Sequence, residues 1–392
     1  MKEHLTIRNF GPIREAEIDV RDLTIFVGPQ ATGKSLAAQA LYFLRGIEEL
    51  ILPEINEPVE KLDAVLRALE WWFGNALSVY TEPGTLLRWC SSEDAIEKAK
   101  REIRWDHAGA HLSETLEGGV PDREVMERQL WDFPWQVYIP AGRALYSFLP
   151  SYVLLSRRRL EWPGYVLTFY ETLGMAIESL WRGVWQPSMF SLAGGGIFGS
   201  DSELAFLRKR VESIIKGEIR YGPDTILLET EQKLLRSATI SAGQMEIWPF
   251  GAIVEVGLKL GMYPATQIYF EEPETHLHPG AQRSVMEIIA FLVRKGVRFL
   301  LTTHSPYILY AVNNFLTAQE VLDAGRALPP DVPPETALRS DQVAAYRFSS
   351  DGTVHDIMDA EVGVIDEDEL DQVADDLGAT FTDLLERLGG AA

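Results

Sequence analysis

The segment from Gly28 to Ser35 constrains the fold of this chain more than any other feature. It reads G-P-Q-A-T-G-K-S and fits the pattern G-x-x-x-x-G-K-[ST], in which backbone N–H groups wrap phosphate groups. The apolar stretch Leu23–Val27 precedes it and a helical pattern, Leu36–Leu44, follows. A buried strand, a phosphate loop and a helix in this order predict a nucleotide site in an α/β fold.

This phosphate loop supplies most of the predicted nucleotide contacts. We expect Lys34 to reach the β and γ phosphates of ATP and Ser35 to bind Mg²⁺. The residues that we expect to bind the nucleotide here are Gly28, Pro29, Gln30, Ala31, Thr32, Gly33, Lys34 and Ser35. The alternative is a glycine turn that binds no ligand.

A second apolar stretch, Ile268–Phe270, ends in the adjacent carboxylates Glu271 and Glu272. Two neighbouring acids at a strand end are costly unless a cation or a reaction needs them. We expect Glu271 to hold Mg²⁺, directly or through water. We expect Glu272 to orient and polarise the attacking water as a catalytic residue. The alternative is an acidic surface turn.

A third motif, Ser241-Ala242-Gly243-Gln244, precedes a predicted helix. A serine hydroxyl and exposed backbone amides at a helix start form an anion site, so Ser241, Gly243 and Gln244 are candidate nucleotide ligands. A simple helix cap is the alternative. The position of Ser241–Gln244 in the chain, before the strand that ends in Glu271 and Glu272, favours the anion site.

Histidines follow two of the predicted strands. His304 ends the apolar stretch 299–303, where it can hydrogen-bond a γ-phosphate and take part in catalysis. His276 and His278 are spaced i, i+2 beside the nucleotide site. We expect them to make loop contacts and assign no metal other than Mg²⁺.

The rest of the chain alternates strand and helix patterns, which predicts a mainly parallel sheet with helical cover and antiparallel N-terminal strands. We expect residues 54–130 to be mostly amphipathic helix, for instance Glu93–Arg104, and 218–228 to form a hairpin. The expected divisions are an N-terminal part of the core with a helical insertion (1–140), a helical and hairpin lobe (141–240), a C-terminal part of the core (241–350) and an acidic helical tail (351–392).

The net charge of −22 is concentrated near the C-terminus: residues 351–392 hold thirteen Asp or Glu against Arg387, a net of −12. Such acidity disfavours DNA binding, which would need a local basic patch. Arg157–Arg159 is a candidate, with a solvated helix face as its alternative. Residues 361–388 predict a helix with an apolar stripe that packs on the chain's own core or docks a partner.

The chain shows no membrane or export signals. It contains no run of about 18 uncharged apolar residues, and its first residues lack the apolar core of a signal peptide. Cys90 is the single cysteine, which excludes an intrachain disulfide. These observations favour a protein of the reducing cytoplasm without a membrane span.

Together the four motifs resemble those of ATP-binding-cassette (ABC) ATPases of the SMC and RecF type. They are more closely similar to the AAA-type stand-alone ATPases allied to the OLD (overcoming lysogenization defect) family. This resemblance implies an SMC-head-like fold in which Gly28–Ser35 is the Walker A motif, Ser241–Gln244 the signature and Glu271 the Walker B acid. It also implies that Thr275–His278 is the D-loop and His304 the switch histidine.

The resemblance further implies a head-to-tail homodimer, or a higher oligomer built from it, with two ATP molecules held between Walker A of one subunit and the signature of the other. Three departures stand out. Gln30 replaces a common asparagine, and Tyr138–Arg143 stands where a glutamine loop is expected, with Arg143 a candidate near the phosphates. The nuclease domain of OLD nucleases does not follow the ATPase in this sequence.

Four functions are consistent with these motifs. The first is a sensor or scaffold ATPase of an antiphage defence system, resembling those of Septu-like and PARIS-like systems, that controls a separate effector nuclease. The second is a RecF-type repair ATPase that binds DNA directly, which the acidic charge disfavours. The third is a transporter's nucleotide-binding subunit, which the Glu271-Glu272-Pro273-Glu274 strand end argues against. The fourth is a nucleotide-binding scaffold with negligible turnover.

Overall fold

The computed structural model describes residues 2–47, 61–74, 77–93, 96–116, 136–141, parts of 164–176, 201–221, 226–230, 233–236, 241–260, 266–366 and parts of 379–382. Three predicted features lie outside these residues: Arg143, the basic run Arg157–Arg159 and most of the tail helix 361–388. None of the described helices combines the length and apolar character that a membrane crossing requires.

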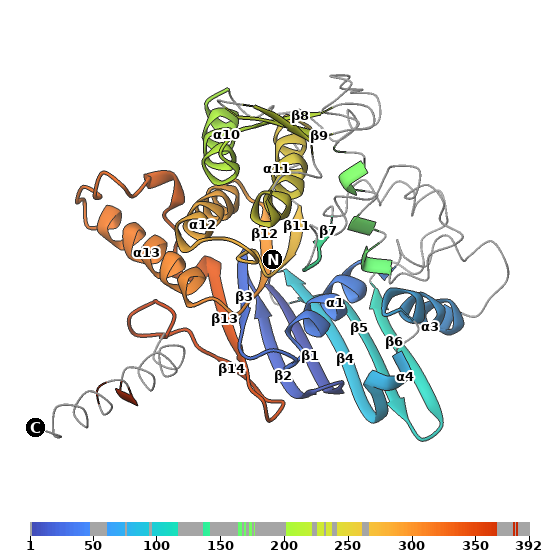
Figure 1. Cartoon of the computed structure of the whole chain (residues 1–392). Coiled ribbons are helices and arrows are strands. Elements are labelled where there is room, and N and C mark those ends of the chain that lie inside the picture. The colour runs from blue at the N-terminus through green and yellow to red at the C-terminus, as the bar shows by residue number, and fades with distance from the viewer. Residues whose placement is uncertain are drawn as a thin grey trace, which may run out of the picture.

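A six-stranded sheet forms the centre of the molecule, with the strand order β14-β13-β3-β12-β11-β7 (Figure 1). The four pairings from β13 to β7 are parallel, and β14 is antiparallel to β13. This confirms the predicted, mainly parallel sheet. The strands are β3 (Leu23–Val27), β7 (Gln136–Ile139), β11 (Gln267–Glu271), β12 (Arg298–Thr303), β13 (Val343–Phe348) and β14 (Val354–Asp356).

The central strands are buried on both faces, as expected for a parallel sheet covered on each side. In β3, Leu23, Ile25 and Val27 face one apolar cluster, and Phe26 faces the other. The first cluster lies under helices whose apolar side chains pack on the sheet. They are α10 (Asp201–Ile215), α11 (Ala242–Leu260), α12 (Pro279–Arg294) and α13 (Pro306–Asp323).

The opposite face is covered by α1 (Lys34–Arg45), α3 (Lys61–Trp72) and a five-stranded antiparallel sheet, as Figure 1 shows. The order in this second sheet is β2-β1-β4-β5-β6, so the predicted N-terminal hairpin is confirmed. Its strands are β1 (Lys2–Phe10), β2 (Ile13–Val20), β4 (Thr81–Glu93), β5 (Ile96–Asp106) and β6 (Gly109–Leu116).

The prediction that residues 54–130 are mostly helix is wrong for the segment 81–116, which forms three paired strands. Only α3 and the short α4 (Leu77–Tyr80) are helical among the described residues of this region. In β5, Arg101 and Ile103 both point into the core. There Arg101 Nη1 donates to the carbonyls of Leu44 and Arg45 at 2.6 and 2.7 Å, and the guanidinium lies over the Trp89 ring. Strands that are buried on one face are recognised by alternating apolar and polar residues. A charged side chain on the buried face interrupts that pattern in the sequence.

The other predicted elements agree with the structure in type. The hairpin at 218–228 is formed by β8 (Glu218–Tyr221) and β9 (Ile226–Glu229), with β10 (Leu234–Arg236) beside it. Helix α13 runs for 18 residues. Pro306 at its start is compatible with the first turn, where no backbone N–H bond is lost.

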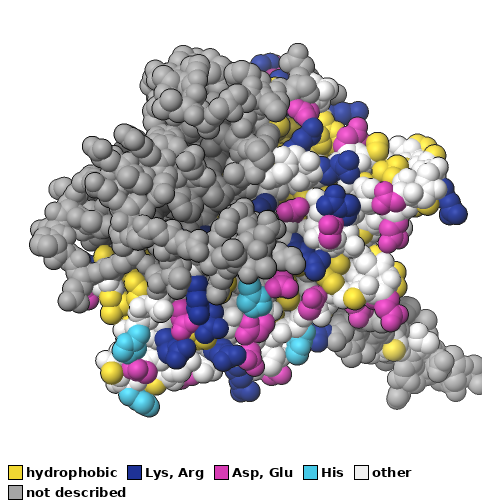
Figure 2. Space-filling model, turned by 180° about the vertical axis from the view of Figure 1, so that it is seen from behind, with side chains coloured by type: hydrophobic (Ala, Val, Ile, Leu, Met, Phe, Trp, Pro, Cys, Tyr) yellow, Lys and Arg dark blue, Asp and Glu magenta, His cyan; other side chains and the backbone are white. Residues whose placement is uncertain are grey.

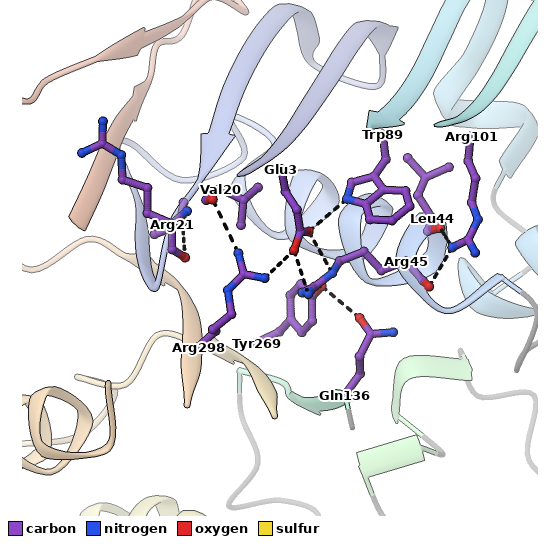
Figure 3. A network of polar contacts seen from close by, with 11 residues as sticks. Glu3, Val20, Arg21, Leu44, Arg45, Trp89, Arg101, Gln136, Tyr269 and Arg298 are labelled. Carbon is purple, nitrogen blue, oxygen red and sulfur yellow. Dashed lines mark hydrogen bonds and ion pairs between the residues drawn. The ribbon is translucent and has the colours of Figure 1, made fainter. Parts of the chain in front are cut away.

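A buried polar network centred on Glu3, here called the Glu3 network, joins the two sheets (Figure 3). The Glu3 carboxylate accepts hydrogen bonds from Arg45, Arg298 and Trp89 Nε1, the last at 3.0 Å. Arg45 also donates to the Tyr269 hydroxyl at 3.2 Å, and that hydroxyl donates to the side chain of Gln136 at 3.0 Å. The network therefore ties β1 and β4 to α1, β7, β11 and β12.

Candidate functional site

Three predicted motifs meet at one edge of the central sheet. Strands β3, β12 and β11 are adjacent and parallel, so their carboxyl ends lie side by side. The phosphate loop follows β3, Glu271 ends β11 with Glu272 directly after it, and His304 follows β12. In open α/β sheets this edge is where ligands bind.

The phosphate loop is a tight turn that depends on two glycines. Gly28 has φ 138°, and a Cβ there would lie 2.2 Å from the Phe348 carbonyl oxygen of β13. Gly33 has φ 100° and caps α1, and a Cβ on it would lie 2.5 Å from Ile13. Side chains are strained at such angles and have no room here. The first turn of α1 carries no acidic residue, which leaves the helix N-terminus attractive to anions.

Lys34 is the cation of this loop. Its side chain is buried, and its Nζ donates to the carbonyl oxygens of Gly28 and Pro29 at 2.8 and 2.7 Å. Burial lowers the pKa of Lys34 to about 8, against the opposing attraction of Glu272 and Glu274. Phosphate oxygens are stronger acceptors than neutral carbonyls, so an incoming polyphosphate can take over this amine.

Glu271, the predicted metal ligand, is buried, and its carboxylate accepts hydrogen bonds from Tyr138 of β7 and from Ala141 shortly after that strand. The Tyr138 hydroxyl donates to its Oε1 at 2.6 Å, and the Ala141 backbone N–H donates to its Oε2 at 2.9 Å. The Glu271 carboxylate and the Ser35 hydroxyl are oxygen donors, which suit Mg²⁺. In the described part of the chain no group of three or more His, Cys, Asp or Glu side chains could hold a metal. Mg²⁺ at these two residues would take its other ligands from ATP and water.

Glu272 and His304 face one another across the edge. Glu272 Oε1 lies 3.4 Å from His304 Nε2, and the side chains are 34% and 28% exposed. Thr275 Oγ1 donates to the other Glu272 oxygen at 3.2 Å. The Glu272 backbone has φ 44°, and its N–H donates to the Thr302 carbonyl at 2.8 Å. The Glu272 carboxylate is thus fixed by His304 and Thr275 and remains accessible to water.

Glu274 is a residue of this site that the motif analysis did not assign. Its Oε1 accepts hydrogen bonds from Thr303 Oγ1 at 2.8 Å and from the His304 backbone N–H at 2.7 Å. It therefore ties the loop after β11 to the end of β12 and fixes the backbone that carries His304. The third acid of the sequence Glu-Glu-Pro-Glu is the signal that could have indicated it.

The segment Ser241–Gln244 begins α11 with reciprocal caps. The Ser241 backbone N–H donates to Gln244 Oε1 at 2.8 Å, and the Gln244 N–H donates to Ser241 Oγ at 3.4 Å. A Cβ on Gly243 would lie 2.7 Å from the His276 carbonyl oxygen. Ser241 and His276 are both exposed. The segment and the Thr275–His278 loop thus form one contiguous surface.

His278 makes the loop contact that its position predicts. Its Nδ1 accepts a hydrogen bond from the Gly280 N–H at 3.2 Å, and it caps α12.

Comparison with known proteins gives matches at both ends of the core. Residues 1–68 match the family described as "AAA ATPase domain". Residues 261–309 match the family described as "AAA domain, putative AbiEii toxin, Type IV TA system". No curated protein matches the chain.

Solved structures of SMC heads and of RecF match this chain at low sequence identity. An SMC head bound to the C-terminal winged-helix domain of ScpA has a TM-score of 0.50 at 12% identity, over 91% of this chain and 96% of that one. An SMC head with an extended coiled coil, bound to the C-terminal domain of ScpA derived from Pyrococcus furiosus, scores 0.46 at 12% identity, over 96% and 99%. RecF of the RecFOR pathway scores 0.41 at 12% identity, over 91% and 98%.

These comparisons confirm the predicted α/β fold and the predicted enzyme class. The match with a TM-score of 0.50 shows the SMC-head-like arrangement of a mainly parallel sheet beside an antiparallel N-terminal sheet. The family matches show an AAA-type ATPase domain, and with it ATP hydrolysis.

Proposed function

We propose that this ATPase works as a head-to-tail dimer and as the sensor or scaffold of an antiphage defence system, where it controls a separate effector nuclease. The observation that carries the proposal is the convergence of Lys34, Glu272 and His304 at one sheet edge, while Ser241 stands exposed at the start of α11.

Each residue of the edge has one role in this proposal. Lys34 exchanges its two loop carbonyls for the β and γ phosphates of ATP. Ser35 and Glu271 hold Mg²⁺, which neutralises charge on the phosphates. Glu272 orients and polarises the attacking water, and His304, 3.4 Å from it, contacts the γ-phosphate and responds to its loss.

The exposed surface at the start of α11 supports the proposed dimer. Ser241–Gln244 presents a helix N-terminus, which attracts an anion, and its neighbour on the same surface is the exposed His276. In the proposed assembly this surface closes over the nucleotide held by the phosphate loop of the other subunit. Two ATP molecules are then buried between two copies of the chain.

Complementation between variants tests this dimer. Ser241→Arg should block closure and turnover, whereas Ser113→Arg, which adds the same side chain at an exposed site on β6, should leave both unchanged. Mixing Ser241→Arg with Lys34→Ala should restore at most one composite site per dimer, measured as phosphate release. Full hydrolysis and ATP-dependent assembly by Ser241→Arg alone would exclude the sandwich.

The defence role has support of two kinds. One of the matched family models carries a description that refers to a toxin of a toxin–antitoxin system. The net charge of −22 disfavours direct DNA binding. On the face in Figure 2, basic and acidic side chains are interspersed, and Arg88 and Arg104 of the outer sheet bond Glu102 at 2.7 and 2.9 Å. These cations are already paired.

Co-purification from native cells tests the role. We expect an effector with nuclease activity to be recovered with the chain, and its activity to change with Glu272→Gln. The purified chain alone should cut no DNA. Metal-dependent DNA cleavage by the chain alone, persisting in Glu272→Gln, would place the nuclease here and refute the proposal.

A further inference from the structure

The end of β7 and the residues directly after it hold both oxygens of the Glu271 carboxylate. Tyr138 donates from its hydroxyl to Oε1 at 2.6 Å, and Ala141 donates from its backbone to Oε2 at 2.9 Å. The two donors are three residues apart on one segment. Strand pairing fixes their approach, because Tyr138 is opposite Tyr269 in the parallel register of β7 and β11, and Ile139 is opposite Phe270.

Packing sets the position of the Tyr138 hydroxyl. The ring is fully buried and has Tyr42, Trp72 and Tyr269 around it, with centroid separations of 5.8, 6.0 and 5.9 Å. Tyr42 belongs to α1. Tyr138 therefore connects the helix that follows the phosphate loop with the carboxylate that ends β11. The ring cannot turn away without opening the aromatic cluster.

Two hydrogen-bond donors orient a carboxylate and still leave some of its lone pairs available. An ionised carboxylate has about four lone-pair sites, so two remain for a metal ion or its bound water. Residues that orient a metal ligand in this way change metal affinity by about 10- to 100-fold when they are lost.

We propose that Tyr138 is a positioning residue for Mg²⁺, which together with the Ala141 N–H holds Glu271 in the orientation that receives the ion. This rests on the proposed role of Glu271 as the metal residue. The same segment stands where the resemblance leads one to expect a glutamine loop. Here a tyrosine hydroxyl and a backbone amide contact the carboxylate on the metal side of the site.

Tyr138→Phe tests the proposal, because it removes the hydroxyl and keeps the ring in its cluster. The first readout is binding of a fluorescent, non-hydrolysable ATP analogue at increasing Mg²⁺, and the second is phosphate release over the same range. We expect the half-saturating Mg²⁺ to rise about 10- to 100-fold, while binding in EDTA is unchanged and excess Mg²⁺ restores turnover. Binding in EDTA also shows that the variant is folded.

Tyr346→Phe is the matched control. Tyr346 is a buried tyrosine facing the same apolar cluster, and its hydroxyl accepts a hydrogen bond from the Asp19 N–H at 2.8 Å. It should keep the Mg²⁺ dependence of the wild type. A Tyr138→Phe chain with wild-type half-saturating Mg²⁺, or with slow turnover that excess Mg²⁺ does not restore, overturns this proposal alone. Wild-type nucleotide binding and turnover that are indifferent to Mg²⁺ would overturn the proposed function as well.

Discussion

Replacing Glu3 with Gln should destabilise the whole molecule, because it leaves two guanidinium groups buried with no anion between them. The Glu3 side chain is 0% exposed, and those of Arg45 and Arg298 are 5% and 15% exposed. Removing one partner of such a buried group costs about 3–5 kcal/mol. In the variant Arg45 still donates to the Tyr269 hydroxyl, and Arg298 is still partly exposed to solvent. We therefore expect a loss of unfolding free energy at the lower end of this range, about 3 kcal/mol.

Urea unfolding followed by tryptophan fluorescence measures this change. Adding Arg298→Met to Glu3→Gln should cost less than the sum of the two single changes, because the two side chains interact directly. A loss below about 1 kcal/mol in Glu3→Gln, or strict additivity in the double variant, would refute the view that the network is a coupled unit.

The pH dependence gives an independent check. Burial alone would raise the pKa of Glu3, but Arg45 and Arg298 outweigh it and hold the pKa below its ordinary value. A lowered carboxyl pKa adds stability above the unfolded pKa, and this stability is lost as the pH falls through the folded pKa. The difference between wild type and Glu3→Gln should therefore shrink in acid and be constant near neutral pH.

Two further predictions concern the ATP site. Glu272→Gln should keep ATP binding and slow phosphate release by about 100- to 10,000-fold, the range for loss of a general base; wild-type turnover would remove Glu272 from that role. Burial places the pKa of Lys34 at about 8, and bound phosphates should raise it, so nucleotide binding should take up about 0.9 proton at pH 9 and about 0.1 at pH 7. Calorimetry in buffers of different ionisation enthalpy measures this uptake, and equal uptake at both pH values would contradict the assignment.

The sequence predicts the ATP-site edge well because each motif lies at the end of an apolar strand. Parallel strands place their carboxyl ends together, so Lys34, Glu272 and His304 could be grouped from local patterns alone. The loop role of His278 also follows from local spacing.

Strands β4, β5 and β6 of the antiparallel sheet were missed for a physical reason. Strand β5 has Arg101 on the buried face, where its polarity gives no sign of burial, and the carbonyls at the end of α1 and the Trp89 ring stabilise it there. The burial of Glu3 could not be predicted either, because its partners lie 42 to 295 residues away in the sequence. The hydrogen bond from Tyr138 to Glu271 joins residues that are 133 positions apart in the sequence. The spacing of apolar residues along the chain cannot predict such a contact.

The place of β3 in the central sheet also sets the order in which the molecule can be made. Its neighbours on the two sides are β12 and β13, which come from residues 298–303 and 343–348. While the chain is being synthesised, the strand before the phosphate loop has no neighbour until β12 has left the ribosome, and its second neighbour is complete only after Phe348 has done so. Long-range pairings of this kind form slowly and expose strand edges to other chains in the meantime. A nascent chain can thus display its phosphate-loop sequence long before it can bind ATP.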